Sequence, residues 1–334
     1  SQTKNAYCTA ERIAYLNFMR GYCPPESASH KNVFREWIGA QIRGDYYGYI
    51  NPGNPEAAAE MAWRDASISH VKNGIYGEMF ASAMIAAAAV TDDMEEIISA
   101  GLAQIPSTSR LFESVSEVVE KYKNGETMEE ILQYVRGKYD EHTEYGWCHT
   151  IPNAMIVAAS LLFGGGYYAK SICLAVEAAY DTDCNGATVG SIVGMAKGIS
   201  AIPDYWRKPI KNKLHTGIFG LETVDIDKRI DLNMENNGEN EEWESRHGYA
   251  CRLFACSLFM LRNINGRPHR VAPTASGQAA LRSDFRNENQ SHAPLFLLFR
   301  EKSRLRMLGV YKCTHIRIRG TTNFSRWFEN AEKA

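Results

Sequence analysis

The chain has 334 residues, of which 45% are hydrophobic and 23% charged, with a net charge of −2; this is ordinary for a globular protein with one large or two smaller domains. No run of 18 uncharged apolar residues occurs, so we expect no transmembrane helix. The first residues lack the apolar core of a signal peptide, and the eight cysteines are scattered without a C-x-x-C pair. We therefore expect a cytoplasmic protein with reduced cysteines.

The spacing of apolar residues predicts a succession of helices with polar turns between them. Pro55 suits the first position of one helix, and Thr127 with Glu130 forms a capping box at the start of another. No period-2 alternation typical of a strand occurs before about residue 260, which predicts an all-α domain. The expected helices cover residues 8–20, 32–49, 56–67, 77–90, 94–101, 108–123, 127–139, 152–163, 168–179, 186–198 and 249–261.

The charge changes sign near the end of the helical part. From Arg262 onward there are 14 Lys and Arg against 5 Asp and Glu, whereas the rest of the chain is acidic overall. Residues 262–294 contain three prolines and many polar residues, which predicts a linker. We therefore expect a helical domain over residues 1–261, a linker over 262–294 and a small basic module over 295–334.

Short apolar runs in the basic module, at residues 295–299, 305–313 and 316–318, are strand candidates. Basic and aromatic residues interleave there, which suits contacts to nucleic-acid phosphates and stacking on bases. A solvated strand face explains the same pattern equally well. The interleaved residues are Phe299, Arg300, Lys302, Arg304, Arg306, Tyr311, Lys312, His315, Arg317 and Arg319.

Asp181 and Asp183 lie two residues apart, between an apolar helical run and glycines spaced every four residues from Gly186 to Gly198. Buried carboxylates are costly unless a cation or hydrogen bonds compensate them. Mg²⁺ is a natural partner, since it prefers oxygen ligands. A helix cap or a solvated turn is the alternative, and the glycines favour close packing of helices.

The residues from Asp181 to Ser191, Asp-Thr-Asp-Cys-Asn-Gly-Ala-Thr-Val-Gly-Ser, resemble the C-terminal signature of the ADP-ribosylglycohydrolase family. Residues 35–45 and 66–78 resemble further family segments, as do 101–106, 206–209 and 216–220, in the family's order. The resemblance extends from about residue 8 to 230. It implies a compact multi-helix bundle that binds Mg²⁺, with two ions in a complete site, and cleaves a glycosidic bond at C1″ of ADP-ribose.

Carried over by position, the resemblance implies that Asp181 and Asp183 are the metal ligands and catalytic carboxylates. Cys184 follows where the family often has Thr or Ser, whose hydroxyl also binds the metal. A thiol is a soft and poor ligand for Mg²⁺. Either Cys184 makes no contact to the metal, or a water or the Thr188 hydroxyl replaces it.

The resemblance also implies contacts to ADP-ribose by Gly39, Gln41, Arg43 and His70. The loop around Gly165 would approach the diphosphate, although a simple helix stop explains that glycine as well.

The family carries a further acidic cluster, of the Asp-Asp-Thr type, in a helix before the region matched here. The sequence does not contain this cluster at that place. Residues 91–93, Thr-Asp-Asp, have a similar composition, but their position favours a helix cap. Two functions stay open: a Mg²⁺-dependent hydrolase of ADP-ribose linkages, as a fragment or completed by another polypeptide, or an impaired module that binds ADP-ribose or nucleic acid.

Overall fold

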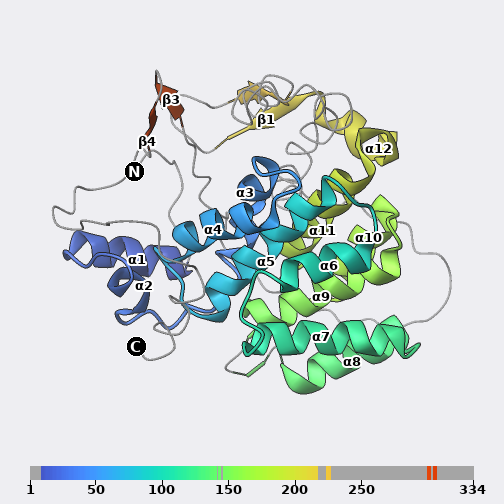
Figure 1. Ribbon diagram of the computed structural model, residues 1–334, viewed down its shortest axis with the longest axis horizontal. Coiled ribbons are helices and arrows are strands. Elements are labelled where there is room, and N and C mark those ends of the chain that lie inside the picture. The colour runs from blue at the N-terminus through green and yellow to red at the C-terminus, as the bar shows by residue number, and fades with distance from the viewer. Residues whose placement is uncertain are drawn as a thin grey trace, which may run out of the picture.

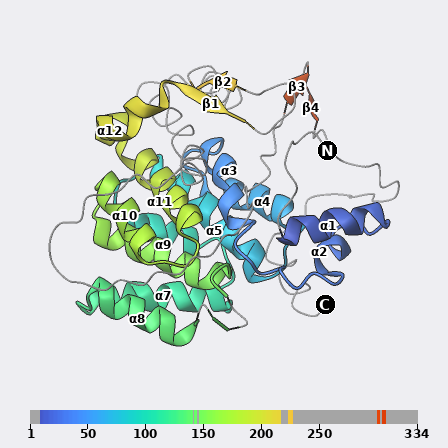
Figure 2. The ribbon, with the colours of Figure 1, turned by 180° about the vertical axis from the view of Figure 1, so that it is seen from behind.

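The computed structural model describes residues 9–140, 142–143, 146–216, 223–226, 299–301 and 304–306. Within these residues the chain is a bundle of α-helices with a few short strands, which confirms the predicted all-α class (Figure 1). The same bundle, seen from behind, shows α1 and α2 at one end and α7 and α8 along one side (Figure 2).

The helices are α1 Thr9–Met19, α2 Glu26–Ser29, α3 Asp45–Tyr49, α4 Pro55–Ala66, α5 Asn73–Ala88, α6 Met94–Leu102, α7 Arg110–Lys123, α8 Met128–Lys138, α9 Thr150–Gly164, α10 Tyr168–Glu177, α11 Thr182–Lys197 and α12 Asp204–Arg207. Short 3₁₀ helices are η1 Gln41–Arg43, η2 Ile199–Ala201 and η3 Lys208–Ile210. The strands are β1 Lys213–His215, β2 Thr223–Asp225, β3 Phe299–Glu301 and β4 Arg304–Arg306.

The core forms around α5, α9 and α11. Helix α5 is rich in alanine and methionine and is buried on nearly all sides, so it packs at once against α3, α4, α6, α9 and α11. Helix α9 is buried along almost its whole length and lies between α5 and the outer pair α7 and α8 (Figure 1). This packing fixes the N-terminal end of α11, where the predicted metal residues lie.

The glycines of α11 let another helix approach closely. A Cβ atom on Gly190 would lie 3.4 Å from Ile172 Cδ1 and 3.4 Å from the Tyr168 hydroxyl oxygen, both on α10. Helices α10 and α11 form one of the most extensive contacts in the bundle. At this position the packing interpretation of the glycine pattern therefore agrees with the structure.

The predicted helix over residues 32–49 is wrong over most of its length. Residues 31–40 form turns, followed only by η1 and α3. This segment instead contacts residues 148–150: Ile38 N donates to Cys148 O at 2.8 Å, Thr150 N donates to Glu36 O at 3.1 Å, and a bridge joins Trp37 to His149. Backbone pairing with a distant segment has taken the place of the local helix.

Other helix boundaries differ by a few residues. Helix α5 begins at Asn73 rather than Gly77, and α11 begins at Thr182 rather than Gly186. Glycine has a low helix propensity, yet Gly77 and Gly186 lie inside these two helices and do not begin them. The buried surroundings of both helix starts outweigh that low propensity.

The region predicted to lack strands contains one short antiparallel pair, β1 with β2, in which Leu214 lies opposite Val224. A second pair, β3 with β4, lies in the predicted β-rich module. The other strand candidates there, the linker over 262–294 and the predicted helix over 249–261 lie outside the described residues.

Two sequence expectations concern the protein's environment. No helix among the described residues is long and apolar enough to cross a membrane. Cys23 is disulfide-bonded, so the expectation that all cysteines are reduced does not hold for this one.

Candidate active site

A sharp turn delivers Asp181 to the start of α11. Ala179 and Tyr180 both adopt positive φ, 69° and 59°, which is uncommon for residues other than glycine. The Tyr180 hydroxyl donates to Tyr139 O at 2.7 Å, which anchors the turn to the end of α8. Backbone strain of this kind persists only where the surrounding structure holds it, and it concentrates at functional sites.

Asp181 occupies the N-cap position of α11, but its carboxylate makes no capping hydrogen bond. Asp93, the N-cap of α6, behaves as an ordinary cap and accepts from Glu95 N at 2.8 Å and Glu96 N at 3.2 Å. The cap interpretation of residues 91–93 therefore agrees with the structure, whereas the Asp181 carboxylate remains available for another partner.

Asn153 of α9 holds the Asp181 backbone in place. Its Oδ1 accepts from Asp181 N at 3.0 Å and from Asn185 Nδ2 at 2.7 Å. Its Nδ2 donates to Trp147 O at 2.9 Å and to His149 O at 2.8 Å. A single buried amide thus joins the starts of α9 and α11, which makes the position of the Asp181 backbone rigid.

The structure brings Asp181, Asp183 and Cys184 together. One potential ligand atom from each lies within 4.8 Å of the others. Asp181 is 6% exposed and Cys184 is 4% exposed, while Asp183 is half-buried. No ion pair to either carboxylate occurs in the described part of the chain, so no protein cation there offsets their charge.

Burial, followed by the hydrogen bond and the negative charge of the neighbouring Asp183, raises the pKa of Asp181 to about 7. Hydrogen bonds with the thiols of Cys184 and Cys148 act in the opposite direction and lower that pKa. Two carboxylates that share one site cannot both ionise without cost, and a bound cation removes that cost.

The two carboxylates fit a hard divalent cation such as Mg²⁺, which takes oxygen ligands. Cys184 does not fit it, because thiolate sulfur is a soft ligand. The donor set therefore supports a divalent cation and agrees only in part with the expected Mg²⁺.

Gln41 lies beside this site but faces inward. It is 1% exposed, and its Oε1 accepts from the Thr150 hydroxyl at 2.9 Å. Through this bond and the pairing with residues 148–150, the segment that carries Gly39 and Gln41 is fixed next to Cys148. The predicted contact of Gln41 with ADP-ribose stays a prediction.

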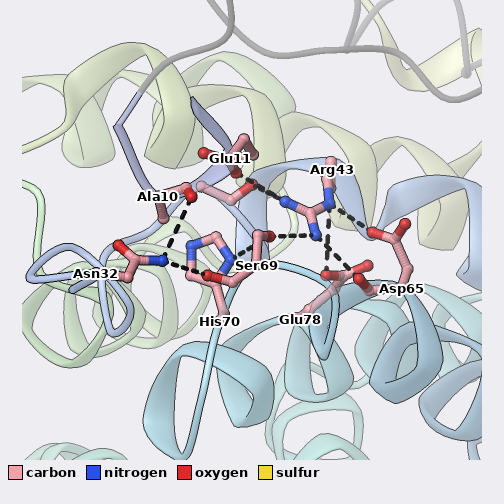
Figure 3. Close-up of polar contacts among 9 residues, drawn as sticks. Ala10, Glu11, Asn32, Arg43, Asp65, Ser69, His70 and Glu78 are labelled. Atoms are coloured by element: carbon pink, nitrogen blue, oxygen red, sulfur yellow. Dashed lines mark hydrogen bonds and ion pairs between the residues drawn. The ribbon is translucent and has the colours of Figure 1, made fainter. Parts of the chain in front are cut away.

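Arg43 lies at the centre of a buried charge cluster with Glu11, Asp65 and Glu78, here called the Arg43 cluster (Figure 3). Its Nη1 donates to Glu11 Oε1 at 2.7 Å, its Nε pairs with the Asp65 carboxylate, and its Nε lies 3.8 Å from Glu78 Oε2. The side chains of all four residues are less than 10% exposed. One guanidinium thus faces three carboxyl groups that come from α1, α4 and α5.

Three buried carboxyl groups around one cation cannot all ionise without a cost in free energy, because one positive charge compensates only one of them. Burial raises the pKa of Glu78 well above its usual value, and the charge of Asp65 adds to the shift, while Arg43 opposes it. Burial likewise raises the pKa of Glu11. Neither carboxyl oxygen of Glu78 has a hydrogen-bond partner among the described residues. A shared proton or a further cation would relieve this arrangement.

Gly39 and His70 both belong to the surroundings of the Arg43 cluster. A Cβ atom on Gly39 would collide with the Glu11 carboxylate and displace it from its ion pair with Arg43. His70 is 1% exposed, and its Nδ1 lies 2.8 Å from the Ser69 hydroxyl, which also accepts from Arg43. Burial, followed by the charge of Arg43, lowers the pKa of His70 well below its usual value, which keeps the ring neutral.

Gly165 lies away from the Asp181 pair. It ends α9 in the left-handed conformation, with φ 60°, as a helix stop requires. Because α9 rises 1.5 Å per residue, Gly165 is about 18 Å along the helix from Asn153, which holds Asp181. The predicted contact of Gly165 with the diphosphate stays a prediction.

Several residues of the site were not predicted. Cys148 was only one of eight scattered cysteines, and nothing in its neighbourhood linked it to Asp181, which lies 33 positions later in the chain. The same holds for Asn153, which resembles any other polar residue of a helix start. Glu11, Asp65 and Glu78 resemble ordinary surface charges until folding surrounds Arg43 with them.

Comparison with known proteins identifies the fold. The family model described as ADP-ribosylglycohydrolase matches residues 2–240, which is more than half of the chain. No curated protein and no solved structure matches the sequence significantly. The family match covers every helix of the bundle and the whole Asp181 site. The chain therefore belongs to the ADP-ribosylglycohydrolase family, whose members are hydrolases of ADP-ribose linkages.

Proposed function

We propose that this protein hydrolyses the glycosidic bond between ADP-ribose and an acceptor, with a divalent cation bound by Asp181 and Asp183. The observation that supports the proposal most is the buried carboxylate pair at the start of α11, which has no protein cation among the described residues and no capping role. In a chain of this family, such a pair fits the metal ligands of the site.

The chemistry assigned to the protein's own residues is limited and specific. Asp181 and Asp183 hold the cation, which when bound acts as a Lewis acid and orients the ribose hydroxyls. Burial and the neighbouring Asp183 raise the pKa of Asp181 to about 7 in the metal-free protein, and a bound cation would lower it, so that the Asp181 carboxylate would be ionised at neutral pH and able to accept a proton from the attacking water. Attack by water at C1″ then releases the acceptor, and no covalent intermediate is required.

The turn before Asp181 supports the proposal, because it restricts how the carboxylates can move. The positive φ values of Ala179 and Tyr180 and the Asn153 hydrogen bond hold the backbone in one conformation. Rigid placement of charged groups reduces the cost of reorganisation during the reaction.

The double variant Asp181→Asn with Asp183→Asn tests the proposal. Release of ADP-ribose from an arginine-linked and from a serine-linked ADP-ribosyl peptide is measured with added Mg²⁺ or Zn²⁺ and with EDTA. We expect the wild-type protein to release ADP-ribose from at least one peptide only with a divalent cation, and the double variant to release none. Asp93→Asn is the matched control, since asparagine caps a helix as well as aspartate does.

Cation-dependent turnover that persists in the double variant would contradict the proposal. Tight, cation-independent binding of ADP-ribose without turnover would favour the alternative of a binding module. The division of the chain at residues 261 and 294 and the cytoplasmic location remain predictions. Contact of residues 295–334 with nucleic acid is likewise a prediction, and a salt-independent affinity for DNA or RNA would contradict it.

A further inference from the structure

Two buried thiols border the carboxylate pair. Cys184 follows Asp183 directly, and its ligand atom belongs to the group within 4.8 Å. Cys148, from the segment before α9, hydrogen-bonds to Asp181 and lies close enough to Cys184 to influence it electrostatically. Cys184 is 4% and Cys148 is 8% exposed, so both sulfur atoms are largely shielded from solvent.

The donor set of the group is two carboxylate oxygens and one sulfur. Mg²⁺ requires octahedral coordination by oxygen and loses its bound water reluctantly. The sulfur of Cys184 therefore adds little to the affinity of the site for Mg²⁺. Zn²⁺ accepts carboxylate oxygen and thiolate sulfur alike, and catalytic zinc sites use three protein ligands with a fourth position left for water. Asp181, Asp183 and Cys184 provide three such ligands.

A buried polar atom of the same helix turn is a second, independent observation. Asn185 is fully buried, and its Nδ2 donates to Asn153, but its Oδ1 has no hydrogen-bond partner among the described residues. An unsatisfied buried acceptor is costly, and a bound ion with its water is a common way to satisfy one. The Asn185 amide and the Asp181 backbone N–H donate to the same oxygen, Asn153 Oδ1, so this amide lies beside the turn that carries Asp181.

We propose that the Asp181 site selects a thiophilic divalent ion of the Zn²⁺ type over Mg²⁺, through coordination by the Cys184 sulfur. The inference deepens the proposed function and rests on it for the identity of the site. Cys148 lies outside the ligand group; it acts as a hydrogen-bond partner of Asp181 and positions that carboxylate.

Cobalt substitution tests this proposal without any need for turnover. The full chain, with the Cys23 disulfide kept intact, is freed of metal with a chelator and titrated with Co²⁺, and the near-ultraviolet absorption band of a thiolate–cobalt bond is recorded. Zn²⁺ and Mg²⁺ then compete for the site, and their affinities follow from the loss of the band. The variants are Cys184→Ser, Cys184→Thr and Cys148→Ser, with Cys173→Ser on the exposed face of α10 as the matched control.

We expect the band in the wild-type protein and in Cys173→Ser and Cys148→Ser, and its loss in both Cys184 variants. Zn²⁺ should displace Co²⁺, while Mg²⁺ should not. Loss of the sulfur should weaken Zn²⁺ binding by about 100-fold, equivalent to about 2.7 kcal/mol. Circular dichroism of each variant checks that the helical content is unchanged.

A band of full strength in folded Cys184→Ser, or displacement of Co²⁺ by Mg²⁺ as readily as by Zn²⁺, would overturn the proposal. These outcomes do not depend on catalysis. Conversely, a cobalt band that depends on Cys184, together with hydrolysis that survives loss of both aspartates, would leave the metal selection standing and contradict only the proposed function.

Discussion

The protein buries carboxyl groups in two places and stabilises them in different ways. In the Arg43 cluster, Glu11, Asp65 and Glu78 surround a guanidinium supplied by the chain itself (Figure 3). At the start of α11, Asp181 and Asp183 lie together with no ion pair in the described residues. Buried charge needs a partner; the chain itself supplies Arg43 to the first group, whereas the proposed partner of the second group is a bound cation.

The difference separates carboxyl groups that pair with a cation of the chain itself from those that we propose bind a metal ion. Both groups are rich in acidic side chains, and both contain carboxyl groups whose pKa is raised by burial. A raised pKa alone therefore does not distinguish the proposed active site from the Arg43 cluster. The presence or absence of an internal cation does distinguish the two.

The largest effect is expected from removal of the internal cation. Arg43→Ala leaves three buried carboxyl groups without a counter-charge and should lower the free energy of unfolding by about 3–5 kcal/mol, measured by urea denaturation. Arg64→Ala removes an exposed ion pair with Glu60 and should cost less than about 0.5 kcal/mol. Equal effects of the two variants would mean that the Arg43 cluster is not held together by its charges.

A smaller effect should follow from supplying the external cation. A divalent ion at about 100 times its dissociation constant should stabilise the wild-type protein by about 2.7 kcal/mol, seen as a higher melting temperature in calorimetry. Asp181→Asn with Asp183→Asn should abolish this stabilisation. If the double variant is stabilised to the same extent, the ion binds elsewhere in the chain.

A third carboxyl group, Asp45 on α3, is buried without an ion pair to Arg43 and outside the proposed metal site. It therefore tests the effect of burial alone. Burial raises its pKa to about 7, the hydrogen bond from the Ser191 hydroxyl opposes the shift, and its Oδ1 has no partner among the described residues. Because this pKa lies above the unfolded value near 3.8, its contribution to stability is complete below about pH 4 and is lost as the pH rises through about 7.

Asp45→Asn should remove this pH dependence. Relative to the wild-type protein, the variant should gain about 1–3 kcal/mol of stability between pH 4 and pH 8, measured as unfolding free energy at each pH. Asp92→Asn, at an exposed carboxylate paired with Lys197, is the control and should not gain stability over that range. A pH dependence unchanged in Asp45→Asn would show that Asp45 ionises normally.

The smallest effect concerns a carboxylate whose partners are backbone N–H groups. Asp93→Ala removes the cap of α6 and should destabilise the protein by about 1 kcal/mol in thermal denaturation, whereas Asp93→Asn should have almost no effect. Equal losses in both variants would indicate that the charge of Asp93, and not its hydrogen bonds, stabilises the helix.

Local patterns gave much of the fold. Asp93 and the Thr127–Glu130 capping box begin helices where the sequence predicts them, since capping depends only on residues within one turn. The prediction was wrong where distant segments compete: residues 32–40 pair with residues 148–150 instead of forming a helix. Helix spacing alone contains no information about such a partner.

The sequence by itself determined that this is an all-α protein with a carboxylate pair at Asp181 and Asp183 and a thiol at Cys184, because these are consecutive residues and helical periodicity is local. Only the tertiary structure decided that Arg43 is enclosed by carboxyl groups from three helices, that Asn153 holds Asp181, and that Cys148 lies beside it. Burial and charge pairing depend on distances between segments far apart in the chain, and those distances exist only once the helices have packed.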